Sequence, residues 1–228
     1  MIILGLTGSI GMGKSTASAM LRRMGVPVYD SDASVHKVLG KAGEAVGLLD
    51  DAFPGVVKKG AVDRNTLGER VFNDDAALKL LESIVHPIVR KIQDNFLKRC
   101  GRRREPLVVL DVPLLFEVNL DKRCDASVVI SAPAFVQAAR VLSRSNMTEE
   151  KFNGILLRQM PDAAKRQRAD FVVPSGRGRA ETLRHLQRIV RLMKQVQATH
   201  WPPDTYADRT AYKRANGGAT NARARTRY

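Results

Sequence analysis

Five short, mostly apolar runs are spread along the chain, and many of the segments between them place apolar residues at helical spacing. The runs cover residues 2–6, 26–29, 107–111, 126–130 and 169–173. Unbroken apolar runs of this length, as opposed to alternating ones, are typical of parallel strands that are buried on both faces. The pattern therefore predicts an α/β fold with a five-stranded parallel sheet and helices between its strands.

The first run ends abruptly in a glycine-rich loop, and a helical pattern starts directly after the loop. Residues 8–15, Gly-Ser-Ile-Gly-Met-Gly-Lys-Ser, match G-x-x-x-x-G-K-[ST] at every fixed position. Glycines permit positive φ and let backbone N–H groups approach a polyphosphate closely. Lys14 adds a cation for the β- and γ-phosphates, and the Ser15 hydroxyl is placed to ligate Mg²⁺. Because strand, loop and helix agree, we interpret this segment as a nucleotide phosphate site.

Two acids follow other strands of the predicted sheet. Asp32 comes just after the second run, and Asp111 closes the third. Parallel α/β sheets bind ligands beyond the carboxyl ends of their strands, so both acids are expected beside the phosphate loop. Asp32 is a candidate general base or Mg²⁺ partner, with capping of the next helix as the alternative. Asp111 has the position of the acid that a Walker B strand directs toward Mg²⁺.

The segment between the second and third strands, about residues 33–100, is too long for an ordinary crossover. We expect a wholly helical insertion on the substrate side. Pro87 interrupts its longest apolar repeat, 78–96, which predicts a kink or two abutting helices. Residues 98–104 are expected to form a basic surface loop. His86, considered alone, is more typical of a core or capping histidine than of a catalyst.

Basic residues follow the fourth strand. A helix is expected to place Gln137, Arg140 and Arg144 on one stripe, because they are three and four positions apart. A solvated basic face is one interpretation; arginines that stabilise the transferring phosphoryl group from a mobile segment are the other. A closing helix is expected at 181–196, and residues 201–228 are predicted to be a basic, disordered tail.

The formal net charge of the 228 residues is +15, which favours anionic partners without choosing among nucleotides, nucleic acid and acidic membrane. Aromatic residues are only 5%, too few for an evident stacking platform, so no specific nucleic-acid partner is expected. No apolar run approaches the ~20 residues that cross a bilayer, and no signal peptide is evident, so a cytoplasmic protein without membrane contact is predicted. Cys100 and Cys124 are expected to be free thiols.

Several motifs occur in order between Met1 and Val173. They are G-L-T-G-S-I-G-M-G-K-S-T at 5–16, V-Y-D-S-D at 28–32, D-R-x-x-L-G-E-R-V-F at 63–72, H-P at 86–87, V-V-L-D-V-P-L-L-F-E at 108–117, Q-A-A-R-V-L-S-R at 137–144, and R-Q-M ahead of K-R-Q-R-A-D-F-V-V. Of these, P-L-L-F-E and Q-x-x-R are not general features of phosphate-loop proteins. With these motifs the chain resembles the dephospho-CoA kinases.

The resemblance implies a nucleoside-monophosphate-kinase-like core, a helical substrate-binding insertion and a small lid. The expected core is 1–32 with 105–137 and 169–200, the insertion is 33–104, and the lid is 138–168. The implied reaction transfers the γ-phosphoryl group of ATP to the ribose 3′-hydroxyl of dephospho-CoA, the last step of coenzyme A biosynthesis. The chain is expected to act as a monomer or weak homo-oligomer. Alternatives are another small-molecule kinase and an ATP-dependent nucleic-acid-binding or assembly factor.

The resemblance also implies roles for individual residues. ATP would be bound by Gly11, Met12, Gly13, Lys14, Ser15, Thr16 and Arg144. Asp32 would be the base, Arg140 the lid arginine that faces the phosphates, and Ser15 and Asp111 the residues near Mg²⁺. Arg64 and His86 would lie on the dephospho-CoA side. The chain departs from the family at 174–176, where Pro-Ser-Gly stands in place of the usual Asn and Gly near the nucleotide base.

Overall fold

The computed structural model describes residues 1–72 and 74–202, and the chain forms two compact units. The first unit comprises residues 1–29 and the described residues from Cys100 onward, and the second comprises residues 30–99. Most of the tail expected at 201–228, from residue 203 on, lies outside the described residues. Within the part described, none of the helices is both long enough and apolar enough to span a membrane.

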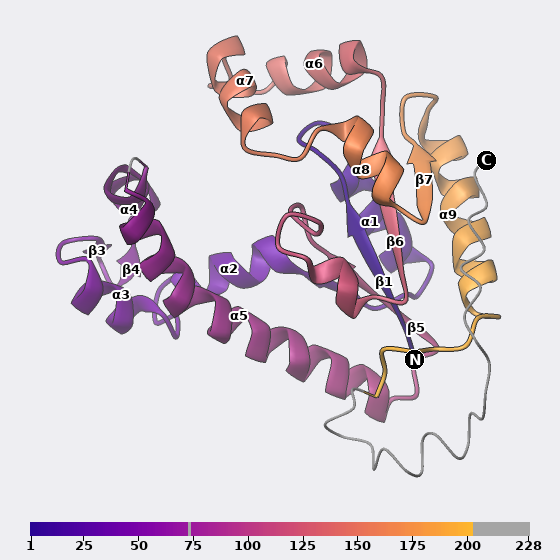
Figure 1. Ribbon diagram of the computed structural model, residues 1–228, viewed down its shortest axis with the longest axis horizontal. Coiled ribbons are helices and arrows are strands. Elements are labelled where there is room, and N and C mark those ends of the chain that lie inside the picture. Colours follow the sequence, from indigo (N-terminus) through magenta and orange to yellow (C-terminus); the bar gives the residue numbers. More distant parts are fainter. Residues whose placement is uncertain (73, 203–228) are drawn as a thin grey trace. The chain divides into compact units, whose positions relative to one another are not determined.

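A five-stranded parallel sheet forms the centre of the first unit (Figure 1). Its strands are β1 (Ile2–Thr7), β2 (Val28–Asp30), β5 (Leu107–Asp111), β6 (Ala126–Ser131) and β7 (Phe171–Pro174). Their spatial order is β2-β5-β1-β6-β7, with β1 in the middle between β5 and β6. The predicted α/β fold and its five-stranded parallel sheet are confirmed, and the five apolar runs correspond to the five strands.

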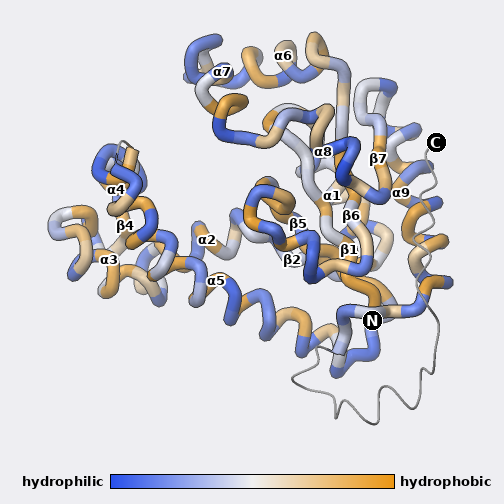
Figure 2. Tube along the Cα trace, viewed as in Figure 1, coloured by the Kyte–Doolittle hydropathy of each residue, from blue (hydrophilic) through white to orange (hydrophobic). Residues whose placement is uncertain are grey.

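The sheet is apolar because both of its faces are covered. Every residue of β1, β5 and β6 is buried, and Figure 2 shows hydrophobic colour along these strands. One face packs against α1 (Lys14–Arg23) and α9 (Arg179–Met193), which contribute apolar residues such as Leu21 and Leu186 to a shared core. Burial on both faces explains why the strands read as continuous apolar runs without alternation.

Three helices lie between β6 and β7: α6 (Ala134–Leu142), α7 (Glu149–Leu157) and α8 (Asp162–Arg168). The prediction that Gln137, Arg140 and Arg144 share one helical stripe is wrong for Arg144, because α6 ends before it. Ser143 is the C-cap, and Asn146 has a positive φ of 64°. Serine and asparagine side chains compete for backbone hydrogen bonds and favour such helix ends.

The second unit has its own apolar core and is not wholly helical, contrary to the prediction. Its elements are α2 (Ser31–Leu39), α3 (Val46–Ala52), β3 (Val57–Lys58), β4 (Ala61–Val62), α4 (Arg64–Val71) and most of α5 (Asp75–Arg102). Strands β3 and β4 pair as an antiparallel hairpin. The two residues of its loop, Lys59 and Gly60, have φ angles of 53° and 78°, the combination that tight hairpin turns require.

Helix α5 passes through Pro87 as a single helix of 28 residues, so the prediction of two abutting helices is wrong. A proline inside a helix costs about 3 kcal/mol because it removes a hydrogen bond and clashes with the preceding turn. Val85 and Ile88, on either side of Pro87, are buried in the core of the second unit, and this burial offsets the cost. The helix also includes residues 98–102, which had been expected in a basic loop.

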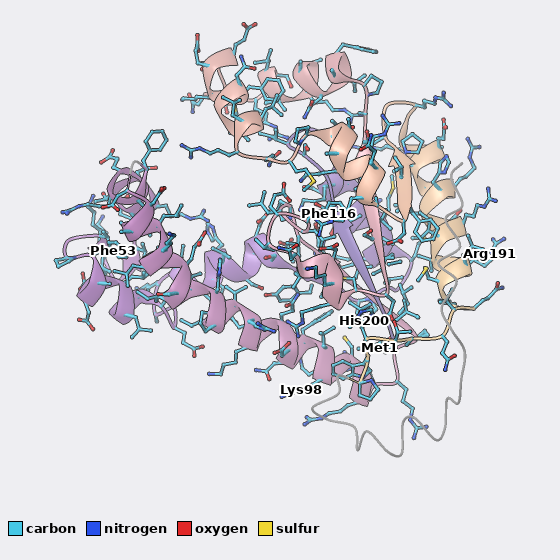
Figure 3. All side chains as sticks on the ribbon, viewed as in Figure 1. Met1, Phe53, Lys98, Phe116, Arg191 and His200 are labelled. Carbon is cyan, nitrogen blue, oxygen red and sulfur yellow. The ribbon has the colours of Figure 1, made fainter. Side chains whose placement is uncertain are left out.

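The chain after α9 is attached to the start of the sheet through Asp125. The Asp125 carboxylate accepts hydrogen bonds from the backbone N–H of Ile3 (2.7 Å), from the N–H and hydroxyl of Thr199, and from the His200 backbone. Its Oδ1 also lies 3.2 Å from Nδ1 of His200, which is labelled near Met1 in Figure 3. Burial alone would raise the pKa of Asp125, but the hydrogen bonds from His200, Ile3 and Thr199 outweigh it and lower the pKa to about 2.

Replacing Asp125 with asparagine is expected to lower the free energy of unfolding near neutral pH by about 2 kcal/mol. The pKa of the carboxyl group is lower in the folded chain than the ordinary 3.8, so its stabilisation is present above about pH 4 and is lost as the pH falls toward about 2. Urea unfolding of both proteins at about pH 6 and about pH 3 should therefore give a smaller difference at the lower pH. Asp50→Asn, at an exposed position of α3, is the control and should change little. A difference between wild type and Asp125→Asn that is equal at both pH values would contradict this account.

Candidate active site

The glycine-rich loop joins the end of β1, the middle strand of the sheet, to the beginning of α1. Within the loop, Gly11 and Gly13 have φ angles of 75° and 91°, which are unfavourable for other residues, and the N–H of Met12 donates to the Ser9 carbonyl at 3.1 Å. Gly13 is the N-cap of α1 and has no side chain that could cap it. The N–H groups of the first helical turn are thus directed toward the loop, an arrangement that favours an anion.

Lys14 and Asp111 form an ion pair at this end of the sheet. The Lys14 Nζ lies 2.7 Å from Oδ1 of Asp111, whose side chain is only 3% exposed. Asp111 is the last residue of β5, which pairs in register with β1 so that Asp111 lies opposite Leu6. The structure therefore brings together the loop lysine and the acid at the end of the neighbouring strand, which are 97 positions apart in the sequence.

Arg140 of α6 lies against the backbone of the phosphate loop. Its Nη1 donates to the Gly11 carbonyl (3.4 Å) and to the Ser175 hydroxyl (3.1 Å), and its Nη2 donates to the Ser175 carbonyl (2.7 Å). The Ser175 hydroxyl in turn donates to the Met12 carbonyl at 2.6 Å. One guanidinium thus connects α6, the phosphate loop and the segment after β7.

Ser175 was not identified from the sequence as a site residue, although it belongs to the segment that departs from the family pattern. Its side chain is buried and supports the loop from the side of β7. Three residues expected to bind the nucleotide, Ser15, Thr16 and Arg144, differ in their exposure and in the element that carries them. Ser15 and Thr16 lie in the first turn of α1, exposed and half-buried respectively, whereas Arg144 is exposed beyond the end of α6.

In the second unit, Asp32 is exposed in the first turn of α2. The N-cap of this helix is Asp30, whose side chain accepts from the N–H of Ala33 at 2.9 Å, so capping does not account for Asp32. Arg64 begins α4, and its Nη1 lies 2.9 Å from Nδ1 of His36. His36 was not identified from the sequence, although it is four positions after Asp32 and thus on the same face of α2.

His86 is exposed in the middle of α5, so it is neither a core nor a capping histidine. The interpretation of His86 as a core or capping histidine is therefore wrong. Its role on the substrate side stays a prediction.

The oxygen donors of the first unit suit a hard divalent cation. Ser15 is the last residue of the loop motif, Asp111 contacts the adjacent Lys14, and both offer oxygen, the ligand that Mg²⁺ prefers. Among residues 1–72 and 74–202, no group of three or more His, Cys, Asp or Glu side chains could hold a metal ion.

Comparison with known proteins gives one consistent family. A family model described as Dephospho-CoA kinase matches residues 2–180. A Dephospho-CoA kinase of Paramagnetospirillum magneticum is 58% identical over 194 residues, which are 85% of this chain and 92% of that protein. One from Rhodopseudomonas palustris is 53% identical over 178 residues, 78% of this chain and 88% of that protein. The crystal structure of TT1252 from Thermus thermophilus is 36% identical with a TM-score of 0.76 and covers 86% of this chain and 98% of that chain.

Gly11→Ala is expected to destabilise the protein more than the same change at Gly25, which has nearly the same φ (75° and 77°). Each alanine would be held in the left-handed region at a cost of about 1–2 kcal/mol. A Cβ at Gly11 would also lie 2.5 Å from Cγ2 of Val141, whereas one at Gly25 would meet nothing within 4 Å. Thermal unfolding of both variants measures the difference, and nucleotide binding should weaken only in Gly11→Ala. Equal losses of stability would show that α6 moves away from the loop without cost.

Proposed function

Because the chain belongs to the dephospho-CoA kinase family, we propose that its phosphate loop, Asp32, Asp111 and Arg140 carry out the reaction of that family. The chain is a kinase that phosphorylates the ribose 3′-hydroxyl of dephospho-CoA at the expense of ATP and so completes coenzyme A biosynthesis. The assignment of roles to its individual residues is our proposal. The observation that carries it is the 2.7 Å contact between Lys14 and Asp111 at the mouth of the loop.

The loop binds the β- and γ-phosphates of ATP through the N–H groups from Gly11 to Thr16. Lys14 adds a positive charge there, and its contact with Asp111 fixes the direction of a long, flexible side chain. Ser15 and Asp111 are the residues that would hold Mg²⁺, which when bound neutralises charge on the phosphate oxygens. In-line transfer spreads charge over the three γ-oxygens, and fixed cations at that position lower the barrier.

Arg140 acts on the nucleotide from the edge of the loop. Its guanidinium is next to the Gly11 carbonyl, so its charge lies beside the phosphate-binding backbone even while it remains bonded to Ser175. Direct contact with the γ-phosphoryl group requires these hydrogen bonds to be exchanged for phosphate oxygens. Charge-assisted bonds to phosphate are stronger than those to neutral carbonyls, so the exchange is favourable when ATP is present. Arg144, exposed on the segment that follows, is proposed as a second cation for ATP.

Asp32 is the proposed general base for the 3′-hydroxyl. It follows β2 by two residues, and β2 is the neighbour of β5, the strand that ends in Asp111. Asp30, and not Asp32, is the N-cap of α2, so capping does not explain the second acid of the D-x-D element. A loose transition state places little demand on the strength of the base, so an aspartate suffices to orient the hydroxyl and accept its proton.

Arg64 and His86 are proposed on the side of dephospho-CoA, and residues 138–168 are proposed as the lid. Arg64 is exposed at the beginning of α4, and a guanidinium at such a position suits the phosphates of the acceptor. The lid excludes water from the γ-phosphoryl group and so suppresses hydrolysis of ATP.

The activity is tested by incubating the protein with ATP, Mg²⁺ and one acceptor at a time: dephospho-CoA, adenosine, AMP or pantetheine phosphate. Only dephospho-CoA should gain a phosphate, and it should do so at its 3′-hydroxyl. Release of phosphate from ATP without any acceptor should be slow in comparison. Phosphorylation of AMP or adenosine in preference to dephospho-CoA would assign the chain to another small-molecule kinase activity.

Asp32→Asn is expected to lower kcat about a hundredfold or more, because the side chain can no longer accept the hydroxyl proton. ATP affinity and thermal stability should stay close to wild type, since Asp30 remains the N-cap of α2. Asp30→Asn is the matched control: asparagine caps helices as well as aspartate does, so its turnover should remain within a few-fold of wild type. Near-normal turnover of Asp32→Asn would remove this acid from the chemical step.

A further inference from the structure

The peptide groups on both sides of Ile10, in the middle of the phosphate loop, are held by two glutamine side chains. The N–H of Ile10 donates to Oε1 of Gln159 at 3.1 Å, and the carbonyl of Ile10 accepts from Nε2 of Gln137 at 2.8 Å. The backbone itself fixes the orientation of the two amides, because an N–H needs an oxygen and a carbonyl needs a donor. One glutamine therefore acts as an acceptor and the other as a donor.

The two glutamines lie at the two ends of the segment 138–158. Gln137 is in α6, is buried, and packs with its backbone carbonyl and Cγ against Gly11. Gln159 follows the end of α7 and is half-buried. Both ends of this segment are thus bonded to the same residue of the phosphate loop.

The end near Gln159 is also fixed to the chain that follows Asp111. The N–H of Met160 donates to Oε1 of Glu117 at 2.9 Å, and the same oxygen is 2.9 Å from Nζ of Lys165 in α8. The Lys165 side chain is fully buried and donates to the Pro113 carbonyl at 3.0 Å. A buried ammonium is stable only when such partners surround it, so α8 cannot leave this position at low cost.

Arg168 provides a second attachment of α8 to the same part of the chain. Its guanidinium forms a 2.9 Å ion pair with Asp121 and lies 5.0 Å above the centre of the Phe116 ring, which Figure 3 labels. Helix α8 therefore belongs to the fixed frame of the first unit, although the proposed lid included it.

We propose that Gln137 and Gln159 are positioning residues that fix the Ile10 peptides and so direct the following N–H groups toward the phosphates of ATP. They also limit lid movement to residues 138–158, because displacing either end breaks a hydrogen bond to the loop. Occupation of the loop by phosphate and placement of the lid are coupled through these two amides. The inference rests on the proposed function and adds residues that its motifs leave without a role.

Replacing each glutamine by glutamate gives the sharpest test. Both changes add one negative charge beside the same residue, so their general electrostatic effect on ATP is similar. At position 159 the carboxylate still accepts the Ile10 N–H, whereas at position 137 it faces the Ile10 carbonyl without a donor. Assays are run at about pH 8, well above the ordinary pKa of a glutamate side chain. We expect kcat/KM for ATP to fall at least about tenfold further in Gln137→Glu than in Gln159→Glu.

Two further variants remove the hydrogen bonds without adding charge. Gln137→Met and Gln159→Met should each lower kcat/KM for ATP about fivefold, with KM for dephospho-CoA within about twofold of wild type. Gln187→Glu, an exposed glutamine of α9, is the control and should behave as wild type. Equal values for the two glutamate variants, or methionine variants with wild-type kinetics for ATP, would overturn the proposal.

Calorimetric binding of ATP to the same variants separates this proposal from the proposed function. If the wild-type protein binds ATP but does not phosphorylate dephospho-CoA, the proposed function fails, and the order of ATP affinities among the glutamate variants still tests the two glutamines. Hydrogen exchange tests the limits of the lid. Addition of a non-hydrolysable ATP analogue should change exchange of amides within 138–158 and leave those of α8 unchanged; a change throughout α8 would refute the fixed frame.

Discussion

Backbone N–H groups bind phosphate strongly only if the chain that bears them is already held in the binding conformation. A glycine-rich loop cannot do this alone, because it has few side chains and a large conformational entropy to lose. Here the surrounding structure provides the restraint. The loop leaves the middle strand of the sheet, Met12 is buried beneath it, and its carbonyls accept hydrogen bonds from Ser175 and Arg140. The cost of ordering the loop is thus met during folding, before a nucleotide binds.

The end of β5 and the chain just after it also contribute to holding the phosphate loop and its surroundings. Asp111 ends the strand and pairs with Lys14, and two residues later the Pro113 carbonyl accepts hydrogen bonds from Thr7 and from the buried Lys165. A short stretch of sequence therefore places the acid and also connects β1 to α8. Displacing this stretch would disturb both the Lys14–Asp111 ion pair and the hydrogen bonds that hold β1 and α8.

The sheet could be predicted from the sequence because burial on both faces leaves continuous apolar runs, and the phosphate loop because its chemistry is local. The β3–β4 hairpin was missed because its strands are two residues long, too short for a periodic signal. The continuity of α5 through Pro87 depends on packing in the folded chain, which a local rule does not include. Ser175 and Gln159 escaped notice for a similar reason: their partners in the loop are 163 and 149 positions away.

The second unit brings several polar side chains together on α2 and at the beginning of α4. Asp30 caps α2 with its own side chain, and the next acid, Asp32, lies in the first turn of the same helix. One turn later on the same face, His36 contacts Arg64, the first residue of α4. A guanidinium has no acceptor atom, so Nδ1 of His36 is the acceptor in this contact. The contact orients the guanidinium of Arg64, and a cation held in this way would suit the phosphates of the proposed acceptor.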